Sequence, residues 1–369
     1  MTTASSATMR AIRFHGNLDV RLDTVPVPRA PGEGEVRVGV AWTGVCGTDR
    51  EEWRHGPLFV PAAAPHPLTG RVAPITMGHE IAGHVLEVGR GVTTLSVGQL
   101  VAIDPNLSCG TCWWCVRHEV GLCRSFGSLG WSEDGGLAEQ VVAQARYCIA
   151  VDPSVDPATA ALAEPVSVAV RAARRGRLRL GESVLVLGGG MIGVAALVVA
   201  RAAGAGPVIV ADPLAGRRDL ALTLGADLAL DPTDPGFGDA VHAATGGRGA
   251  DLTFEAAGVP GSAAAALAVT RSGGRCVIVG LSARPTEIDT FTMAARELEL
   301  IGTMAHVWDE DLAGAVRLLE RGALRADQVV AARVALEDTV ELGFSSVGRT
   351  DLPGVKVLVS PSLPPAARG

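Results

Sequence analysis

The sequence predicts an α/β protein built from two parts, a β-rich part and a doubly wound parallel sheet. From about residue 160 to 300, short apolar segments alternate with Ala-rich segments, and each pair occupies about 25 to 30 residues. This alternation is typical of βαβ units, in which helices cover both faces of a parallel sheet. From about residue 10 to 150, short β-rich segments are separated by Gly and Pro, which is typical of an irregular, partly barrel-like β domain.

The individual elements follow from the same patterns. In the β-rich part, strands are expected within GEVRVGVAW, HEIAGHVLEVG and GQLVAI. In the parallel-sheet part, strands and helices are expected within SVLVLGGG, GVAALVVARAAGA, PVIVAD, RRDLALTLGAD, DLTFEAAG and GGRCVIVGL. After residue 305, DEDLAGAVRLLERG predicts an amphipathic helix and VKVLV a strand, so this last segment is expected to pack against the first part.

Length and charge narrow the class of protein. A chain of 369 residues favours two domains, because single cores rarely exceed about 250 to 300 residues. The net charge of −7 argues against a nucleic-acid or anionic-membrane partner, which would favour a basic surface. One basic cluster is expected to form a solvated helix face. It consists of Arg171, Arg174, Arg175, Arg177 and Arg179.

The sequence carries no pattern of membrane insertion or secretion. The N-terminal residues MTTASSAT are small and polar, and no run reaches the roughly 20 apolar residues that a membrane-spanning helix needs. We therefore expect a cytoplasmic protein. In a reducing compartment, clustered cysteines indicate metal ligation rather than disulfides.

Residues 188–193, GGGMIG, supply the G-x-G-x-x-G pattern through Gly188, Gly190 and Gly193. The pattern alone is weak, but here it follows the apolar segment 183–187 and precedes a predicted helix, which is the context a dinucleotide site needs. The first glycine permits a tight turn, the second allows the backbone to approach a pyrophosphate, and the third permits close helix–strand packing. These features predict a dinucleotide-binding domain.

Asp212 ends the next predicted strand, about 20 residues after the glycines. A carboxylate there can accept hydrogen bonds from the ribose hydroxyls and would repel a 2′-phosphate, so NAD is favoured over NADP. Arg217 and Arg218 follow closely, and they either stack on the adenine or are simply solvated.

Four of the seven cysteines lie in CGTCWWCVRHEVGLC, as Cys109, Cys112, Cys115 and Cys123. Four thiolates at about 2.3 Å complete a closed tetrahedron around zinc, which orders a loop and carries no water to activate. An iron–sulfur run has a shorter final gap followed by Pro, and disulfides within so short a segment would be strained. The spacing therefore predicts a structural zinc.

A second, open metal site is suggested by residues outside this loop. Cys46 lies in GVCGTD, His79 and Glu80 lie in GHE, and Glu164 lies in AEPVSVAV. Thiolate, imidazole and carboxylate are the ligand types of a three-ligand catalytic zinc with one position left for water or substrate. Each residue also has a purely structural explanation, and spacing alone does not show that they converge.

Taken together, these motifs resemble a known family. GVCGTD, GHE, the four-cysteine loop, EPVSVAV, GGGMIG and FEAAGVPG occur in the order of the zinc-dependent medium-chain alcohol and polyol dehydrogenases, from about residue 9 to 358. GPLFVP and PHPLTGRVAPITMGHE look most like 2,3-butanediol dehydrogenases and their sorbitol dehydrogenase relatives. The resemblance implies a GroES-like catalytic domain formed by residues 1–157 and 305–369, an inserted Rossmann domain at 158–304, and a homodimer or homotetramer.

The resemblance also implies roles for matching residues. Cys46, His79 and either Glu164 or Glu80 would bind the catalytic zinc. Because adjacent residues in extended backbone point in opposite directions, His79 and Glu80 are not expected to ligate together. Thr48 would hydrogen-bond the substrate hydroxyl and pass its proton onward.

On the cofactor side, the implied contacts lie around the glycine turn and at a later strand end. They are Gly188, Gly190, Ile192, Gly193, Asp212, Arg217, Val279, Gly280 and Leu281.

One position departs from the family. Members commonly carry a histidine five residues after the zinc cysteine, at the end of a proton relay, and here that residue is Glu51. Either Glu51 accepts the proton, or water carries the relay and Glu51 is solvated. We favour the first interpretation, although a carboxylate is a weaker base near neutral pH than an imidazole.

The resulting hypothesis is a reversible oxidation of a secondary alcohol to a ketone, with zinc lowering the pKa of the alcohol and the nicotinamide accepting hydride. A vicinal diol or polyol is the favoured substrate, and Trp53, Phe59 and Trp131 are candidates for an apolar pocket wall. Alternatives are a cyclitol or aminocyclitol dehydrogenase and an L-threonine dehydrogenase. A zinc-free quinone-reductase-like or crystallin-like protein is the alternative from a different class.

Overall fold

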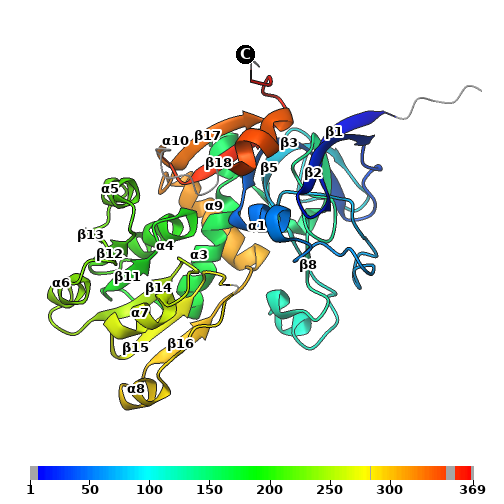
Figure 1. Ribbon diagram of the computed structural model, residues 1–369. Helices are drawn as coiled ribbons and strands as arrows, with labels where there is room; N and C mark the ends of the chain where they lie inside the picture. The colour runs from blue at the N-terminus through cyan, green and yellow to red at the C-terminus, as the bar shows by residue number, and fades with distance from the viewer. Residues whose placement is uncertain (1–6, 283, 346–353, 367–369) are drawn as a thin grey trace, which may run out of the picture. The chain divides into compact units, whose positions relative to one another are not determined.

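The computed structural model describes residues 7–282, 284–345 and 354–366. The chain divides into two compact units. One unit comprises the residues up to Glu164 together with those from His306 onward, and the other comprises Pro165–Ala305. In the colours of Figure 1, the first unit runs from blue through cyan to the beginning of green and from orange to red, and the second runs from green through yellow to the beginning of orange.

The second unit contains a six-stranded parallel sheet, which confirms the predicted doubly wound fold. The strand order is β13-β12-β11-β14-β15-β16, so the chain starts in the centre, runs to one edge and then returns to build the other. Ligands bind such sheets outside the carboxyl ends of the central strands, where the order reverses. The strands are β11 (Val184–Leu187), β12 (Val208–Ala211), β13 (Leu228–Leu230), β14 (Ala250–Glu255), β15 (Thr270–Ile278) and β16 (Glu299–Gly302).

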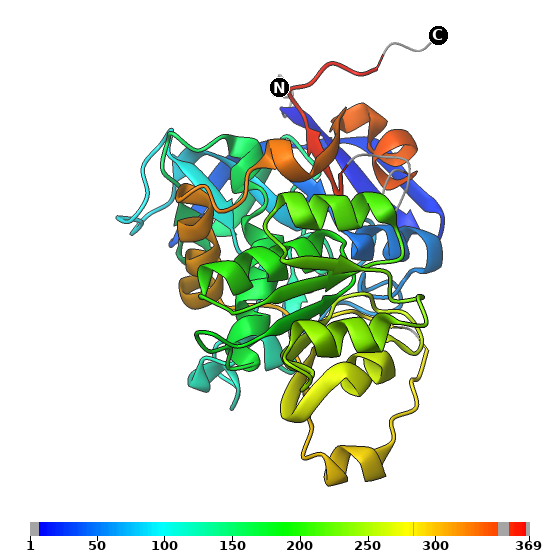
Figure 2. The ribbon, with the colours of Figure 1, turned by 90° about the vertical axis from the view of Figure 1, so that its left-hand side faces the viewer.

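Helices lie on both faces of this sheet (Figure 2). Central strands buried on both faces are apolar throughout, and β11 and β12 accordingly read VLVL and VIVA, with every residue buried. Leu185, Ile209 and Ala266 are members of the resulting core. The helices are α3 (Ala163–Arg175), α4 (Met191–Ala202), α5 (Ala215–Thr223), α6 (Phe237–Ala244), α7 (Ser262–Val269) and α8 (Thr290–Ala295).

The first unit is built around a seven-stranded sheet of order β10-β6-β5-β3-β18-β17, in which β9 also pairs with β3. The C-terminal strand β18 pairs antiparallel with β3 and parallel with β17, so segments from both ends of the sequence share one sheet. Apolar residues of β3, β5 and β6, including Val38, Ile81 and Val101, form its core. The strands are β3 (Glu35–Val45), β5 (Glu80–Val88), β6 (Leu100–Ile103), β9 (Gln140–Gln144), β10 (Cys148–Ala150), β17 (Val330–Ala335) and β18 (Lys356–Ser360).

Smaller elements complete the first unit. A three-stranded sheet has the order β2-β1-β4, and a two-stranded sheet pairs β7 with β8. These strands are β1 (Thr8–Gly16), β2 (Asp19–Pro26), β4 (Ile75–Thr76), β7 (Asn106–Leu107) and β8 (Gly127–Ser128). The α-helices are α1 (Gly47–His55), α2 (Pro157–Ala160), α9 (Ala313–Glu320) and α10 (Ala326–Val329). The remaining turns of helix are η1 (Cys115–Arg117), η2 (Val120–Leu122), η3 (Ala145–Tyr147), η4 (Trp308–Leu312), η5 (Leu336–Asp338) and η6 (Thr339–Phe344).

One expectation about the basic cluster was wrong. Arg174, Arg175, Arg177 and Arg179 are exposed, but Arg171 is buried. Arg171 lies on the same face of α3 as Arg174 and Arg175 but one turn earlier, so this face is buried at Arg171 and exposed at the end of the helix. Among the described residues, no helix combines the length and the apolar composition needed to cross a bilayer.

Candidate active site

The sequence-predicted residues Cys46, His79 and Glu80 come together in the first unit. One potential ligand atom from each lies within 4.8 Å of the other two. His79 and Glu80 are buried, and Cys46 is partly buried. A thiol, an imidazole and a carboxylate at this separation match the donor set of a three-ligand zinc site, so zinc fits these residues.

Adjacent elements of the sheet produce this convergence. β3 ends at Val45, and Cys46 is the residue that caps the N-terminus of α1. Glu80, the first residue of β5, pairs in register with Gly44 on β3. A Cβ on Gly44 would lie 1.8 Å from Glu80 Oε2, so only glycine leaves room for this carboxylate.

The expectation that His79 and Glu80 would point apart was wrong. It assumed that both residues belong to one extended strand, but β5 begins at Glu80 and His79 precedes it. Strand alternation therefore does not apply between them. Their ligand atoms lie in the same group, together with Cys46 Sγ.

His79 is held by a fully buried carboxylate. Asp49 Oδ1 lies 3.4 Å from His79 Nδ1, and Asp49 Oδ2 accepts a hydrogen bond of 3.0 Å from the backbone N–H of Cys46. Burial opposes the charged imidazole, but Asp49 and Cys46 outweigh it and raise the pKa of His79 well above its usual value. With Asp49 at Nδ1, Nε2 is the ring atom that faces Thr48 Oγ1, at 3.5 Å. A carboxylate behind a histidine in this way fixes the ring of a metal ligand.

Glu80 has a buried cationic partner, Lys356. Lys356 Nζ donates to Glu80 Oε1 at 2.6 Å and to the carbonyl of Val45 at 3.2 Å. Burial lowers the pKa of Lys356, but Glu80 and Cys46 raise it above its usual value, so the ammonium stays charged. Glu80 Oε2 is buried with no hydrogen-bond partner among the described residues, which leaves one oxygen available to a cation.

Glu164 lies outside the group of Cys46, His79 and Glu80 but is electrostatically coupled to it. The residue is in the first turn of α3, and its side chain is 11 % exposed. Burial raises the pKa of Glu164, whereas the positive charges of His306 and His79 lower it. Glu164 Oε1 lies 3.7 Å from His306 Nδ1.

Thr48, Glu51 and His55 lie on one side of α1, since residues three and four apart face the same way on a helix. Thr48 is next to His79, whereas Glu51 is 48 % exposed and lies 3.7 Å from His55 Nε2. This side of the helix therefore runs from the buried site toward solvent.

Two of the three predicted pocket aromatics lie near the site. Trp131 contacts His79 edge-on, with ring centroids 5.0 Å apart, and Phe59 stacks on Trp131 at 4.5 Å. Trp53 instead packs against Phe344 and a separate buried core.

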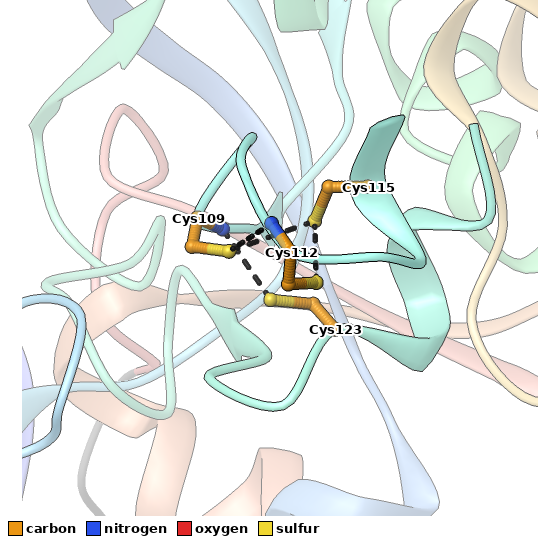
Figure 3. A group of neighbouring side chains, drawn as sticks. All are labelled: Cys109, Cys112, Cys115 and Cys123. Atoms are coloured by element: carbon orange, nitrogen blue, oxygen red, sulfur yellow. Dashed lines mark hydrogen bonds between the residues drawn. The ribbon is translucent and has the colours of Figure 1, made fainter. Parts of the chain in front are cut away.

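The four cysteines of the loop form a second group within 4.8 Å. Figure 3 shows their sulfur atoms turned toward one another, from a segment that includes η1 and η2. Cys115 Sγ lies 3.5 Å from Cys112 Sγ and 3.9 Å from Cys109 Sγ. Four sulfurs at about 2.3 Å from a tetrahedral zinc would be about 3.8 Å apart, so these distances fit that ion.

The glycine turn lies between β11 and α4 in the second unit. Gly188 has φ +104°, and a Cβ on Gly193 would lie 1.7 Å from the carbonyl oxygen of Gly188. Gly190 caps the N-terminus of α4, and a Cβ there would meet no atom within 4 Å. A tight turn, close helix–strand packing and open space before a helix N-terminus fit the pyrophosphate of a dinucleotide. Ile192 lies in the first turn of α4.

Asp212 directly follows β12 and is buried beside this turn. Its Oδ2 accepts from the backbone N–H of Gly189 at 2.8 Å and lies 3.2 Å from Arg217, and its Oδ1 accepts from Leu214 N–H at 2.9 Å. A carboxylate has about four acceptor sites, so with these three contacts one remains for a ribose hydroxyl.

At the carboxyl end of β15, Val279, Gly280 and Leu281 form the predicted strand end. The backbone N–H groups of Val279 and Gly280 donate to the carbonyl of Glu255, which ends β14. A Cβ on Gly280 would lie 2.3 Å from the nitrogen of Gly258, so the two loop backbones are in close contact there.

Comparisons with known proteins agree with this geometry. The model for the alcohol dehydrogenase GroES-like domain matches residues 32–153, and the model for zinc-binding dehydrogenases matches residues 192–321. The (R,R)-butanediol dehydrogenase of Neisseria gonorrhoeae is 32% identical over 366 residues, which cover 96% of this chain and 100% of the relative. The chain belongs to the zinc-dependent medium-chain alcohol dehydrogenase family.

Solved structures extend the agreement to this dehydrogenase as a whole. It is similar to 2R,3R-butanediol dehydrogenase from Bacillus subtilis, with a TM-score of 0.88 and 31% identity over 96% of this chain and 100% of that chain. It is also similar to a Sinorhizobium meliloti 1021 protein described as a zinc-binding dehydrogenase and bound to NADP, with a TM-score of 0.85 and 30% identity over 96% and 100% of the chains. The predicted fold, oxidoreductase class, and use of zinc and a nicotinamide cofactor are confirmed.

Four residues of this dehydrogenase's site were missed in the sequence. They are Asp49, Lys356, His306 and Asp104, whose Oδ1 lies 3.3 Å from His306 Nε2, and none of them lies in a segment with a metal-ligand spacing. Lys356 did carry a signal in the sequence. It is the only lysine of the chain, and all the other long basic side chains are arginines. A long cationic side chain that is unique in the sequence and lies in an apolar strand is a candidate for a buried ion pair.

Proposed function

We propose that this dehydrogenase interconverts one secondary alcohol of a vicinal diol or polyol and the corresponding ketone. The observation that carries the proposal is the convergence of Cys46, His79 and Glu80 beside the hydroxyl of Thr48. Similarity to butanediol dehydrogenases over nearly the whole chain supports a diol as substrate. When bound, zinc supplies a Lewis acid for the alcohol oxygen, and the nicotinamide supplies the hydride acceptor.

In this proposal Cys46 and His79 are constant zinc ligands, and one carboxylate completes a three-ligand site. Glu80 and Glu164 are the two candidates. Glu80 lies in the same group as Cys46 and His79, with Oε2 unpartnered, while Glu164 is buried and coupled to both His79 and Glu80. Either arrangement leaves a fourth position for the substrate oxygen, and the second carboxylate can exchange with the first.

Thr48 receives the proton of the substrate alcohol. Its hydroxyl is next to His79 Nε2, and a hydroxyl can accept one proton while it donates another. Glu51 follows on the same side of α1 and is exposed, so it can pass the proton to solvent, with His55 beside it. This arrangement supports Glu51 in place of the relay histidine.

Specificity for a diol is proposed to come from two different sides of the substrate site, one aromatic and one carrying a carboxylate. Phe59 and Trp131 form a stacked aromatic pair next to His79, which suits the carbon skeleton of the substrate. The second hydroxyl would donate to whichever of Glu80 and Glu164 is not bound to zinc. A simple alcohol lacks this group and would forgo that hydrogen bond to a buried carboxylate, which makes its binding weaker.

We propose NAD as the cofactor. A 2′-phosphate would meet the buried carboxylate of Asp212, and Arg217 is already paired with that carboxylate. Both features disfavour NADP. We also propose a second, structural zinc on Cys109, Cys112, Cys115 and Cys123.

The test combines metal analysis with a substrate panel. Two zinc ions per chain and faster reduction of NAD than of NADP are expected, with 2,3-butanediol and polyols preferred over ethanol, cyclitols and threonine. Preference for threonine or a cyclitol would replace the diol while keeping the metal site. A chain that contains no zinc and reduces quinones would overturn the proposal in favour of the zinc-free class.

Assembly and location stay predictions. A homodimer or homotetramer is proposed from the resemblance to the family, and sedimentation of the purified protein would decide between them. A cytoplasmic location is proposed from the cluster of four cysteines, because clustered thiols that ligate a metal are typical of a reducing compartment, and fractionation of the source cells would test it.

A further inference from the structure

A buried histidine outside the ligand group has carboxylates at both ring nitrogens. His306 is 1 % exposed, with Nε2 3.3 Å from Asp104 Oδ1 and Nδ1 3.7 Å from Glu164 Oε1. Neither ring nitrogen has a hydrogen-bond partner of normal geometry among the described residues. The ring therefore interacts with its surroundings mainly through charge.

His306 is fixed from the side away from Glu164. Asp104 directly follows β6 and is itself oriented by a hydrogen bond of 2.8 Å from the backbone N–H of Asn106 to its Oδ1. Asn106 Nδ2 in turn donates to the carbonyl of His306 at 3.1 Å. Residues 104–106 thus hold both the ring and the backbone of His306.

His118 of the four-cysteine loop and Tyr147 of η3 hold the next residues of the same segment. His118 Nε2 lies 2.8 Å from Asp309 Oδ1, and the rings of His118 and Tyr147 both contact Trp308 edge-on at 5.0 Å. Because Asn106 begins β7, which leads into this loop, the loop is linked to the His306 segment at two places. These contacts therefore hold His306 in place beside the carboxylate of Glu164, whose other possible partner is the catalytic zinc.

We propose that His306 is a positioning residue whose Nδ1 sets the direction of the Glu164 carboxylate and thereby its availability as a ligand of the catalytic zinc. This inference rests on the proposed function, because it takes Glu164 as a zinc ligand. Partners behind the ligands of a metal commonly change metal affinity by about 10- to 100-fold when they are replaced. His306 differs from Asp49 in that it acts on a carboxylate rather than on an imidazole.

Two substitutions of His306 form a matched pair. In His306→Asn, the side-chain amide reaches about as far as Nδ1 and keeps a donor toward Glu164. In His306→Gln, the amide reaches about as far as Nε2 and keeps a donor toward Asp104 instead. Both remove the ring and its charge, so a merely structural role would be disturbed similarly by both.

The readouts are the rate at which excess EDTA removes the zinc ions from the holoenzyme and the visible spectrum of the protein after Co²⁺ has replaced the catalytic zinc. His306→Gln should accelerate loss of the catalytic zinc by about 10- to 100-fold and shift the Co²⁺ bands. His306→Asn should stay within about threefold of the wild-type rate. Equal effects of the two variants on both readouts would overturn the proposal.

A double substitution separates this inference from the proposed function. If His306 acts through Glu164, adding His306→Gln to Glu164→Gln should cause no further loss of zinc. Wild-type zinc retention and an unchanged Co²⁺ spectrum in Glu164→Gln would overturn the role of His306, whereas retention of both zinc ions in Cys46→Ser would overturn the proposed function itself. His15→Asn, whose amide does not reach the position of Nε2 and so removes a contact of 2.7 Å between His15 on β1 and Asp23 on β2, is the control and should leave both readouts unchanged.

Discussion

The two groups of possible metal ligands are built in opposite ways. The four-cysteine group comes from one short segment, uses a single donor type, and has three of its four members only partly buried. The group of Cys46, His79 and Glu80 draws on β3, α1 and β5, mixes three donor types, and is surrounded by buried charges from Asp49, Lys356 and Glu164. The first group suits a structural metal site that orders a loop, and the second group suits a site that binds and releases substrate.

The contrast shows what each group needs from the rest of the chain. A closed tetrahedron of thiolates fills every coordination position of its ion and needs only a turn of the right spacing. An open site needs buried partners that prevent its ligands from rearranging, and here every ligand candidate other than Cys46 has one. In the proposed function, chemistry at the second group therefore depends on Asp49, His306 and Lys356, which do not touch substrate.

The largest expected difference comes from removing one cysteine from each group. Cys46→Ser should lower kcat by about 10³-fold or more, because the Lewis acid contributes several kcal/mol, and should leave one zinc per chain and a cooperative unfolding transition. Cys112→Ser should also lose one zinc, but mainly make the segment 109–123 sensitive to proteases. Metal analysis, steady-state kinetics and limited proteolysis distinguish the two, with Cys148→Ala as a control outside both groups. If both variants became sensitive to proteases, the proposed difference between a loop-ordering group and a catalytic group would be wrong.

Lys356 tests whether the second group depends on buried charge balance. Lys356→Met leaves Glu80 buried without its cation, and the free energy of unfolding of the metal-stripped protein should fall by about 3–5 kcal/mol in a denaturant titration. Adding Glu80→Gln removes the unpaired charge and should restore most of that loss. If the double variant is no more stable than the single one, the ion pair is not the reason.

Substitution of Glu51 tests whether proton transfer from the group of Cys46, His79 and Glu80 continues through this side chain to solvent. Glu51→Gln should lower alcohol oxidation near neutral pH by about 10- to 100-fold, since a positioned base contributes about 10²- to 10⁴-fold and water can replace an exposed one in part. The measurement is the pH dependence of kcat, with His55→Gln as the neighbouring control on α1. A profile that Glu51→Gln leaves unchanged would assign the relay to water.

The smallest effect concerns differences within the four-cysteine group. Backbone N–H groups of Thr111 and Cys112 lower the pKa of the Cys109 thiol to about 6, whereas burial raises that of Cys123 to about 12. Above its pKa a thiol is the reactive thiolate, so in metal-stripped protein at pH 7 Cys109 should be alkylated fastest and Cys123 slowest. Iodoacetamide labelling followed by peptide mass spectrometry measures the order. Equal rates would show that the loop without metal loses this arrangement.

The same contrast explains what the sequence could reveal. The alternating pattern from 160 to 300 and the glycine turn were sufficient for the parallel sheet, because those signals are local, and the four cysteines were readable for the same reason. Cys46, His79 and Glu164 were identified through a family resemblance, since spacing could not show their convergence. The opposed directions expected for His79 and Glu80 failed at a strand boundary, which is the least reliable part of a pattern-based prediction.

The charged partners Lys356 and His306 could not be predicted from the sequence for a different reason. Lys356 reaches Glu80 only because β18 pairs with β3, and His306 reaches Glu164 only because the segment after Ala305 returns to the first unit. Both contacts join residues that are far apart in the sequence, and no local periodicity records them. A burial argument for the unique lysine was available, but not the identity of its partner.

The position of β18 has a consequence for how the protein matures. As the chain emerges from the ribosome, residues 109–123 are complete long before Lys356 is synthesised. The four-cysteine group can form on a nascent chain, whereas Glu80 gains the ammonium of Lys356 only when β18 pairs with β3. The proposal of two zinc ions thus predicts an order in time, in which the four-cysteine group binds its ion first and the group of Cys46, His79 and Glu80 is completed last.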